Sequence, residues 1–184
     1  MNHFRISIAD EITLLITQKQ SHGRALAKDW PLTTVQRELK LLTEQKIIQS
    51  KQQGKNVIYK LRTGPQARAA VIAAETYALR KCLSKFPLLE PLIEDLQAMT
   101  NVPICVFGSY ATGTATEKSD IDLHIFTDDS SIRKKIASIN SKLSVKTGLI
   151  SDEPLSREIK RKHIIIQGYD HYYGAFAKIP SNTD

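Results

Sequence analysis

Two short apolar stretches joined by a Gly-Ser turn, the second interrupted by two acids, constrain this chain more than any other feature. The segment is VPICVFGSYATGTATEKSDIDLHIF, residues 102–126. We predict a buried strand at 103–107 and a second strand that carries Asp120 and Asp122. Because side chains alternate along a strand, both carboxylates lie on one face. Like charges side by side are costly unless cations neutralise them, and carboxylate oxygens suit Mg2+.

The turn between the two predicted strands has residues suited to phosphate. Gly108 has no Cβ, so its backbone can approach a ligand closely. Ser109 supplies a hydroxyl and an amide where a helix is expected to begin, and phosphate oxygens bind favourably at such a terminus. His124 is on the face of the two acids, where it either touches phosphate or is a half-buried strand residue. These residues indicate a site for nucleotide phosphates carried by a metal ion.

The pattern G-S-x10-D-x-D resembles the nucleotidyltransferase superfamily related to DNA polymerase beta, especially its minimal, single-domain members. The resemblance implies transfer of a nucleoside monophosphate from a nucleoside triphosphate, with ATP expected, to a hydroxyl or phosphate acceptor. It implies that Gly108 and Ser109 bind the outer phosphates. It also implies that Asp120 and Asp122 are catalytic and ligate two Mg2+ ions, which stabilise charge on the attacking and leaving oxygens.

Active members of this superfamily carry a third carboxylate on a later strand, and here the sequence departs from the pattern. The next predicted strand, SVKTGLI, has Lys146 among its alternating positions and no acid. Asp152 is the candidate third catalytic residue, since it follows that strand directly, together with Glu153. Alternatively, the two acids cap the helix expected at PLSREIKRK, because acids near a helix N-terminus are common.

The first third of the chain predicts three helices. They are expected at IADEITLLITQKQ, SHGRALAKDW and LTTVQRELKLLTEQK. Ser21 is the expected cap of the second helix, and Thr33 and Gln36 have capping-box spacing in the third. Apolar residues of the third helix form one stripe, which leaves its polar residues on the rest of the cylinder.

A hairpin is predicted after these helices, with Gly54 at its tip. Val57, Tyr59 and Leu61 alternate with polar neighbours and are expected on its buried face. Three helices and a basic hairpin in about sixty residues resemble a winged helix-turn-helix, whose third helix enters the DNA major groove. That resemblance implies contacts to double-stranded DNA from a recognition helix and a wing. The implied DNA-binding residues are Thr33, Thr34, Gln36, Arg37, Lys40, Lys51 and Lys55.

The positive charge of the chain is concentrated in this first third. Residues 1–63 hold eleven Lys or Arg and five Asp or Glu, which gives +6 of the formal net charge of +7. A basic module on a neutral remainder indicates binding to a polyanion, although winged helices also serve as protein-docking or dimerisation modules. Lysines contribute mainly sequence-independent attraction to phosphate.

The predicted fold class is α+β with two domains. We expect a winged helix-turn-helix at 1–63, a helical connector at 64–85 and a nucleotidyltransferase fold at 86–184, with a mixed sheet flanked by helices. The connector offers an apolar face, and winged helices commonly bind palindromic sites as dimers, so a homodimer is expected.

The composition points to an ordinary globular protein of the cytoplasm. The chain has no run of eighteen apolar residues and no signal-peptide pattern at its start. Cys82 and Cys105 lie in apolar surroundings and are expected to be buried thiols. The scattered histidines form no recognisable transition-metal motif.

Three functions are compatible with these patterns. The first is a Mg2+-dependent nucleotidyltransferase that a DNA-binding winged helix brings to nucleic acid or to a promoter. The second is a DNA-binding transcriptional regulator whose degenerate transferase domain senses nucleotide without catalysis, which the missing third acid favours. The third is an antitoxin-type nucleotidyltransferase that modifies a partner protein.

Overall fold

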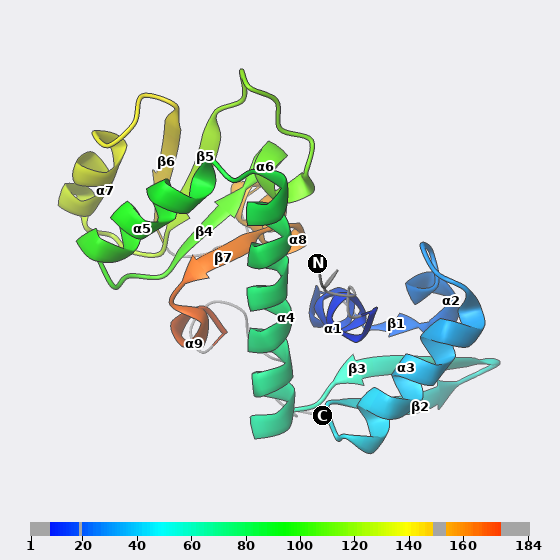
Figure 1. Cartoon of the computed structure of the whole chain (residues 1–184). Coiled ribbons are helices and arrows are strands. Elements are labelled where there is room, and N and C mark those ends of the chain that lie inside the picture. Colours follow the sequence, from blue (N-terminus) through cyan, green and yellow to red (C-terminus); the bar gives the residue numbers. More distant parts are fainter. Residues whose placement is uncertain (1–7, 19, 149–153, 174–184) are drawn as a thin grey trace. The chain divides into compact units, whose positions relative to one another are not determined.

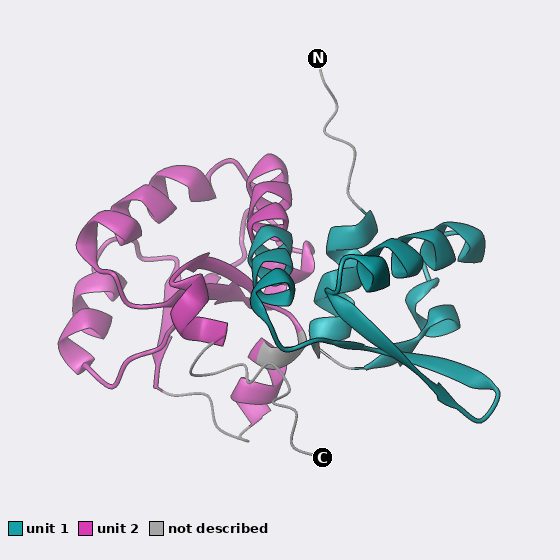
Figure 2. Cartoon of the chain, turned by 90° about the horizontal axis from the view of Figure 1, so that it is seen from below, with its two compact units in different colours: residues 1–75, 179–184 teal, residues 76–178 magenta. Residues whose placement is uncertain are grey.

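The computed structural model describes residues 8–18, 20–148 and 154–173 (Figure 1). The chain forms two compact units, which divide inside one helix between Glu75 and Thr76 (Figure 2). Each unit has its own sheet and its own buried side chains. In the described part of the chain, no helix is both long and apolar enough to cross a bilayer.

The first unit is a winged helix made of three helices and a three-stranded antiparallel sheet. Its elements are α1 (Ile8–Gln18), β1 (Ser21–His22), α2 (Gly23–Leu26), α3 (Leu32–Glu44), β2 (Ile48–Gln53) and β3 (Asn56–Leu61). The strand order is β1-β3-β2, with both pairings antiparallel. The three predicted helices and the predicted hairpin are present, and the short strand β1 is an addition to them.

Apolar side chains at helical spacing make the core of the winged helix. Val35, Leu39 and Leu42 of α3 are buried, which is the stripe that the sequence predicts. Ile12 and Ile16 of α1 are buried as well, and α1 packs against α3 and β3. The remaining faces of α3 are left with polar side chains in solvent.

The cap predicted for the second helix is wrong by one residue. Ser21 is part of β1 and pairs with Tyr59 of β3. The N-cap of α2 is His22, whose Nδ1 accepts a hydrogen bond from the backbone N–H of Ala25 at 3.2 Å. Strand pairing with β3 takes Ser21 out of the position in which its hydroxyl could cap the helix.

The capping box predicted for α3 is also absent. Pro31 is the N-cap residue, and no side chain caps the helix. Thr33 is therefore already inside the first turn, where its hydroxyl is no longer at the position that a capping side chain must occupy.

The wing has a buried face only at its base. Leu61 is buried, Tyr59 is half-buried and Val57 is 38% exposed, so the predicted apolar face is correct only in part. The outer half of the hairpin extends away from the three helices (Figure 1). Lys51 and Lys55 lie there and are exposed to solvent.

Helix α4 (Pro65–Lys85) follows the wing, and α5 (Leu89–Met99) follows α4. Helix α4 lies within 64–85, where the sequence predicts a helical connector. Cys82, near the end of α4, is buried, and its burial raises the pKa of the thiol to about 11. Cys105 is buried too, so both cysteines are the buried thiols that their surroundings predict.

The second unit is built around a four-stranded mixed sheet. Its further elements are β4 (Ile104–Phe107), α6 (Gly108–Thr112), β5 (Ile121–Ile125), α7 (Ser130–Ala137), β6 (Leu143–Thr147), α8 (Pro154–Arg161), β7 (Ile164–Gln167) and α9 (Tyr169–His171). The strand order is β6-β5-β4-β7, in which β5 and β6 are parallel and the other pairs antiparallel. This arrangement confirms the predicted α+β class and mixed sheet.

The sheet and its helices bury two groups of side chains. One is the main apolar core, in which Val106 and Leu123 of the strands join Leu96 of α5 and Ile136 of α7. The other is aromatic: the rings of Phe126 and Tyr172 meet edge-on with centroids 5.1 Å apart, and Tyr172 meets Tyr173 in the same way. Both tyrosines are buried, so they serve as packing residues.

Gly168 ends β7 in a place with no room for a side chain. Its φ is +77°, and a Cβ would lie 2.6 Å from the Cα of Pro103. Gly113 has nearly the same φ, +76°, but there the nearest atom to a Cβ is the flexible Nζ of Lys85 at 3.5 Å. The two glycines therefore share a backbone conformation and differ in their surroundings.

We expect Gly168→Ala to lower the free energy of unfolding more than Gly113→Ala does. Left-handed backbone costs an L residue roughly 1–2 kcal/mol at both positions. Only Gly168→Ala adds a clash with the backbone of Pro103, and overpacking of this kind costs about 1–3 kcal/mol more. Urea denaturation of the two variants measures the difference, and equal losses would contradict the steric argument.

Candidate functional site

The turn after β4 brings Gly108 directly against the carboxylate of Asp122. Phe107 and Asp122 are paired in register, so the residue after Phe107 lies beside the Asp122 side chain. A Cβ at position 108 would overlap Oδ2 of Asp122, and the φ of Gly108 is +65°. Glycine is therefore required at this position both by the backbone conformation and by the lack of space.

The two acids flank the start of β5. Asp120 directly precedes the strand and is exposed, whereas Asp122 is half-buried within it. Their alternation with buried Ile121 and Leu123 puts both carboxylates on one side of the strand, as predicted. No side chain in the described part of the chain forms an ion pair or hydrogen bond with either acid. Among the residues that the structure describes, these two neighbouring carboxylates have no cation beside them.

Ser109 follows Gly108 on α6, and its main chain anchors the loop that leads to the acids. Its carbonyl oxygen accepts hydrogen bonds from the N–H groups of Thr114 and Ala115, at 2.9 and 3.2 Å. Its hydroxyl has no hydrogen-bond partner among the described residues and is half-buried. The hydroxyl is therefore available to a ligand beside Gly108.

The loop between α6 and β5 is fixed at two further points. The hydroxyl of Ser119 accepts from the N–H of Thr116 at 2.9 Å. Lys142, just before β6, donates from Nζ to the carbonyl of Glu117 at 2.8 Å. These hydrogen bonds fix the loop that leads to Asp120, so the backbone before both acids is held in place.

The neighbouring strand β6 contributes no acid to this face. In the parallel pairing of β5 and β6, Ser144 lies beside Asp122 and Lys146 lies beside His124. Lys146 is exposed. Asp152, the candidate third catalytic residue, falls in 149–153, outside the residues that the structure describes. Among the described residues, no group of three or more His, Cys, Asp or Glu side chains is placed to hold a metal ion.

His124 is more deeply buried than the sequence suggests. It is 3% exposed, so the expectation of a half-buried residue is wrong. Its Nε2 lies 3.0 Å from the carbonyl oxygen of Gly148, and its ring meets Phe126 edge-on at 4.6 Å between centroids. Burial lowers the pKa of His124, and the bond to Gly148 opposes this shift. Its Nδ1 is buried without a hydrogen-bond partner.

The residues predicted to bind DNA lie on α3 and the wing. Thr33, Gln36, Arg37 and Lys40 are exposed on α3, and Thr34 is half-buried there. On the wing, Lys51 of β2 and Lys55 of the hairpin turn are exposed.

Ion pairs reduce the positive charge of α3. The Nη2 of Arg37 lies 3.0 Å from Oε1 of Glu38, and the Nζ of Lys40 lies 3.9 Å from Oε1 of Glu44. Each predicted cation of α3 thus has an acid beside it. The spacing of four between Lys40 and Glu44 is a signal that the sequence contains and that the prediction did not use.

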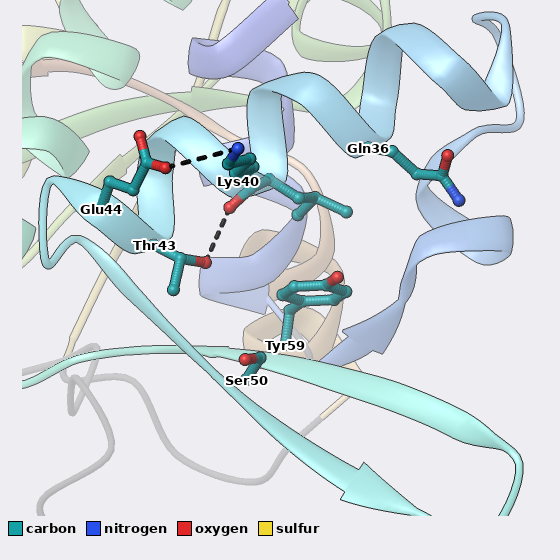
Figure 3. Close-up of a pocket in the computed structure, with 7 residues that line it drawn as sticks. Gln36, Lys40, Thr43, Glu44, Ser50 and Tyr59 are labelled. Carbon is teal, nitrogen blue, oxygen red and sulfur yellow. Dashed lines mark hydrogen bonds and ion pairs between the residues drawn. The ribbon is translucent and has the colours of Figure 1, made fainter.

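A groove lies between α3 and the wing. Its cavity is about 320 Å³ and is lined by Ser50 of β2, Tyr59 of β3 and five residues of α3, which are Gln36, Leu39, Lys40, Thr43 and Glu44 (Figure 3). Ser50 and Tyr59 are neighbours in the antiparallel pairing. Sequence reasoning missed these two hydroxyls, since their position beside α3 depends on how the hairpin folds back on the helix.

Comparisons with known proteins give one family match. Residues 89–171 match the family model described as nucleotidyltransferase domain. This range includes the Gly108 turn, both acids of β5 and all four strands of the second unit. No curated protein matches the sequence.

Solved structures similar to this chain include two bacterial proteins. A mutant of ZitR from Lactococcus lactis is 24% identical with a TM-score of 0.37, and the match covers 48% of this chain and 62% of that chain. A second ZitR mutant is 19% identical with a TM-score of 0.40, over 50% and 64% of the two chains. The adhesin competence repressor AdcR of Streptococcus pyogenes is 16% identical with a TM-score of 0.40, over 49% and 69%.

The element order α1-β1-α2-α3-β2-β3 and the sheet order β1-β3-β2 establish the winged-helix fold of the first unit independently of these neighbours. The second unit combines the matched sequence with a mixed sheet and a Gly-Ser turn against a pair of acids. The chain therefore carries a nucleotidyltransferase domain at residues 89–171, joined to an N-terminal winged helix.

Proposed function

We propose that this protein is a DNA-binding regulator whose nucleotidyltransferase domain binds a nucleoside triphosphate together with Mg2+. The observation that carries the proposal is the pair of unpartnered carboxylates, Asp120 and Asp122, with the second held against Gly108. Such a pair is unfavourable on its own and becomes favourable when a cation binds between the acids and a polyanion. ATP is the nucleotide that we would test first.

The donor set fits Mg2+, which prefers oxygen ligands. Asp120 and Asp122 would hold the ion, and its chemistry there is to neutralise charge on the phosphates. Gly108 leaves room for phosphate beside the backbone, and the free hydroxyl of Ser109 can donate a hydrogen bond to it. None of these four residues has to move to another part of the fold to take this role.

Strand β6 favours binding without transfer. Nucleotidyl transfer needs a base for the acceptor hydroxyl, and β6 presents Ser144 and Lys146 beside Asp122 and His124 instead of an acid. A nucleotide held by two acids and a Gly-Ser turn can then act as a signal. In this proposal the nucleotidyltransferase domain senses nucleotide, and the winged helix binds DNA.

Transfer of a nucleoside monophosphate is the second candidate. The intact turn and the intact acid pair favour it, since these groups serve binding and catalysis alike. Asp152 would then supply the third carboxylate.

Double-stranded DNA is the expected partner of the winged helix. Exposed Lys51 and Lys55 on the wing have no acid paired with them among the described residues, and α3 offers Gln36 and Thr33 to base edges. Phosphate attraction comes mainly from the wing, because Arg37 and Lys40 each have an acid close by.

The double variant Asp120→Asn/Asp122→Asn should lose Mg2+-dependent nucleotide binding. We expect the affinity for nucleoside triphosphate to fall at least about tenfold, because amides carry no charge to hold the ion. Isothermal titration with and without Mg2+ measures this. Asp128→Asn is the matched control, since Asp128 is an exposed acid just after β5. Unchanged affinity in the double variant would remove the site assignment.

The wild-type protein should release no pyrophosphate above the level of the double variant. Each of the four nucleoside triphosphates is incubated with the protein, Mg2+ and cell extract as acceptor, and pyrophosphate and label transfer are followed. Our reason is the absence of an acid on β6 beside Asp122. Release that the double variant abolishes would establish transfer, and Asp152→Asn would then test the third carboxylate.

Lys51→Ala and Lys55→Ala should each weaken DNA binding and lower the slope of log K against log salt by about one. Lys40→Ala should lower the slope less, because the charge of Lys40 is partly balanced by Glu44 at 3.9 Å. Fluorescence anisotropy with a labelled duplex over a range of salt concentrations measures all three. A larger effect from Lys40→Ala than from the wing variants would contradict this distribution of contacts.

A further inference from the structure

The C-terminal end of α4 contacts α6 near the C-terminal end of α6. The Nζ of Lys85 donates to the carbonyl oxygen of Gly113 at 2.7 Å, at the C-terminal end of α6. The ring of Phe86 meets that of Tyr110 edge-on at 4.9 Å between centroids. The Sγ of Cys82 lies 4.0 Å from the carbonyl oxygen of Tyr110. Two residues of α4 and the residue that follows it thus contact α6 and its C-cap.

The same α4 is shared by the two units. It is one continuous helix of 21 residues, and Figure 2 shows it in both colours, with the division after Glu75. Only residues 62–64 separate it from β3 of the wing. The N–H of Arg62 still bonds to the carbonyl of Ile47 at 2.9 Å, which continues the base of the hairpin to the helix. Helix α4 is therefore the element that directly follows the wing and whose other end contacts α6.

We propose that α4 couples nucleotide binding at the Gly108 turn to DNA binding by the winged helix, with Lys85 as the positioning residue that joins α4 to α6. The inference rests on the proposed function. Helix α6 has five residues, too few to be stable by its own hydrogen bonds. Its position therefore depends on its contacts, which are the burial of Tyr110 and Ala111 in the core and the hydrogen bond from Lys85 to Gly113.

This dependence makes the coupling reciprocal. A ligand at Gly108 and Ser109 that shifts α6 also changes the contacts of Lys85 and Phe86, so part of its binding free energy is transmitted to the end of α4. By thermodynamic linkage, a state of α4 favoured by bound DNA then changes the affinity for nucleotide by the same factor.

The test is a binding cycle on the full chain. DNA affinity is measured by anisotropy with a labelled duplex, without nucleotide and with Mg2+ and a saturating nucleoside triphosphate, for the wild type and four variants. In Lys85→Met the stem stays and the donor is lost, whereas Lys85→Arg keeps a donor. Phe86→Leu removes the ring contact with Tyr110 and leaves the lysine. Lys135→Met removes an exposed lysine of α7 and is the matched control.

We expect nucleotide to change the wild-type DNA affinity at least about fivefold in one direction. This change in DNA affinity should persist in Lys135→Met and Lys85→Arg. It should fall towards one in Lys85→Met and Phe86→Leu. Thermal unfolding of each variant is recorded to show that it is folded. The coupling is overturned if the wild type binds both ligands but nucleotide leaves its DNA affinity unchanged. It is also overturned if nucleotide changes the DNA affinity of Lys85→Met as much as it changes that of the wild type. A wild type that binds none of the four nucleotides overturns the proposed function itself.

Discussion

The close approach of Gly108 to the Asp122 carboxylate is the constraint on which the second unit depends. Antiparallel pairing of β4 and β5 puts Phe107 opposite Asp122, so the turn that follows β4 has to pass against that side chain. A Cβ there would force the carboxylate of Asp122 to move, and a φ of +65° at the start of α6 strains any residue other than glycine. The turn, the helix and the acid are thereby placed by the sheet and not by a flexible loop.

Charge acts differently in the two units. The first third of the chain holds nearly all of the net positive charge, yet α3 pairs Arg37 with Glu38 and Lys40 with Glu44. Lys51 and Lys55, on the wing, have no acid paired with them among the described residues. The helix is therefore left with polar groups that suit discrimination between bases, and the wing with charges that suit attraction to any duplex. In the second unit, two negative charges stand together at the start of β5.

Periodicity along the sequence was sufficient to predict most helices and strands, because each buries one face. Val35, Leu39 and Leu42 on α3, and Ile121, Leu123 and Ile125 on β5, show this directly. The same local pattern could not predict the cap at His22, since pairing of Ser21 with Tyr59 involves residues far apart in sequence. It also missed the burial of His124 and the hydroxyls of Ser50 and Tyr59, which depend on how separate elements pack. The acid pair and the Gly-Ser turn were predictable because their spacing itself encodes the geometry.

Lys146 also affects whether the edge of the sheet can pair with another chain. β6 is at one end of the order β6-β5-β4-β7, and an end strand exposes backbone groups that can pair with another chain. An exposed lysine on such a strand disfavours that pairing, because two copies would bring like charges together. The residue that stands where an acid is expected thus also discourages this edge from joining a second molecule.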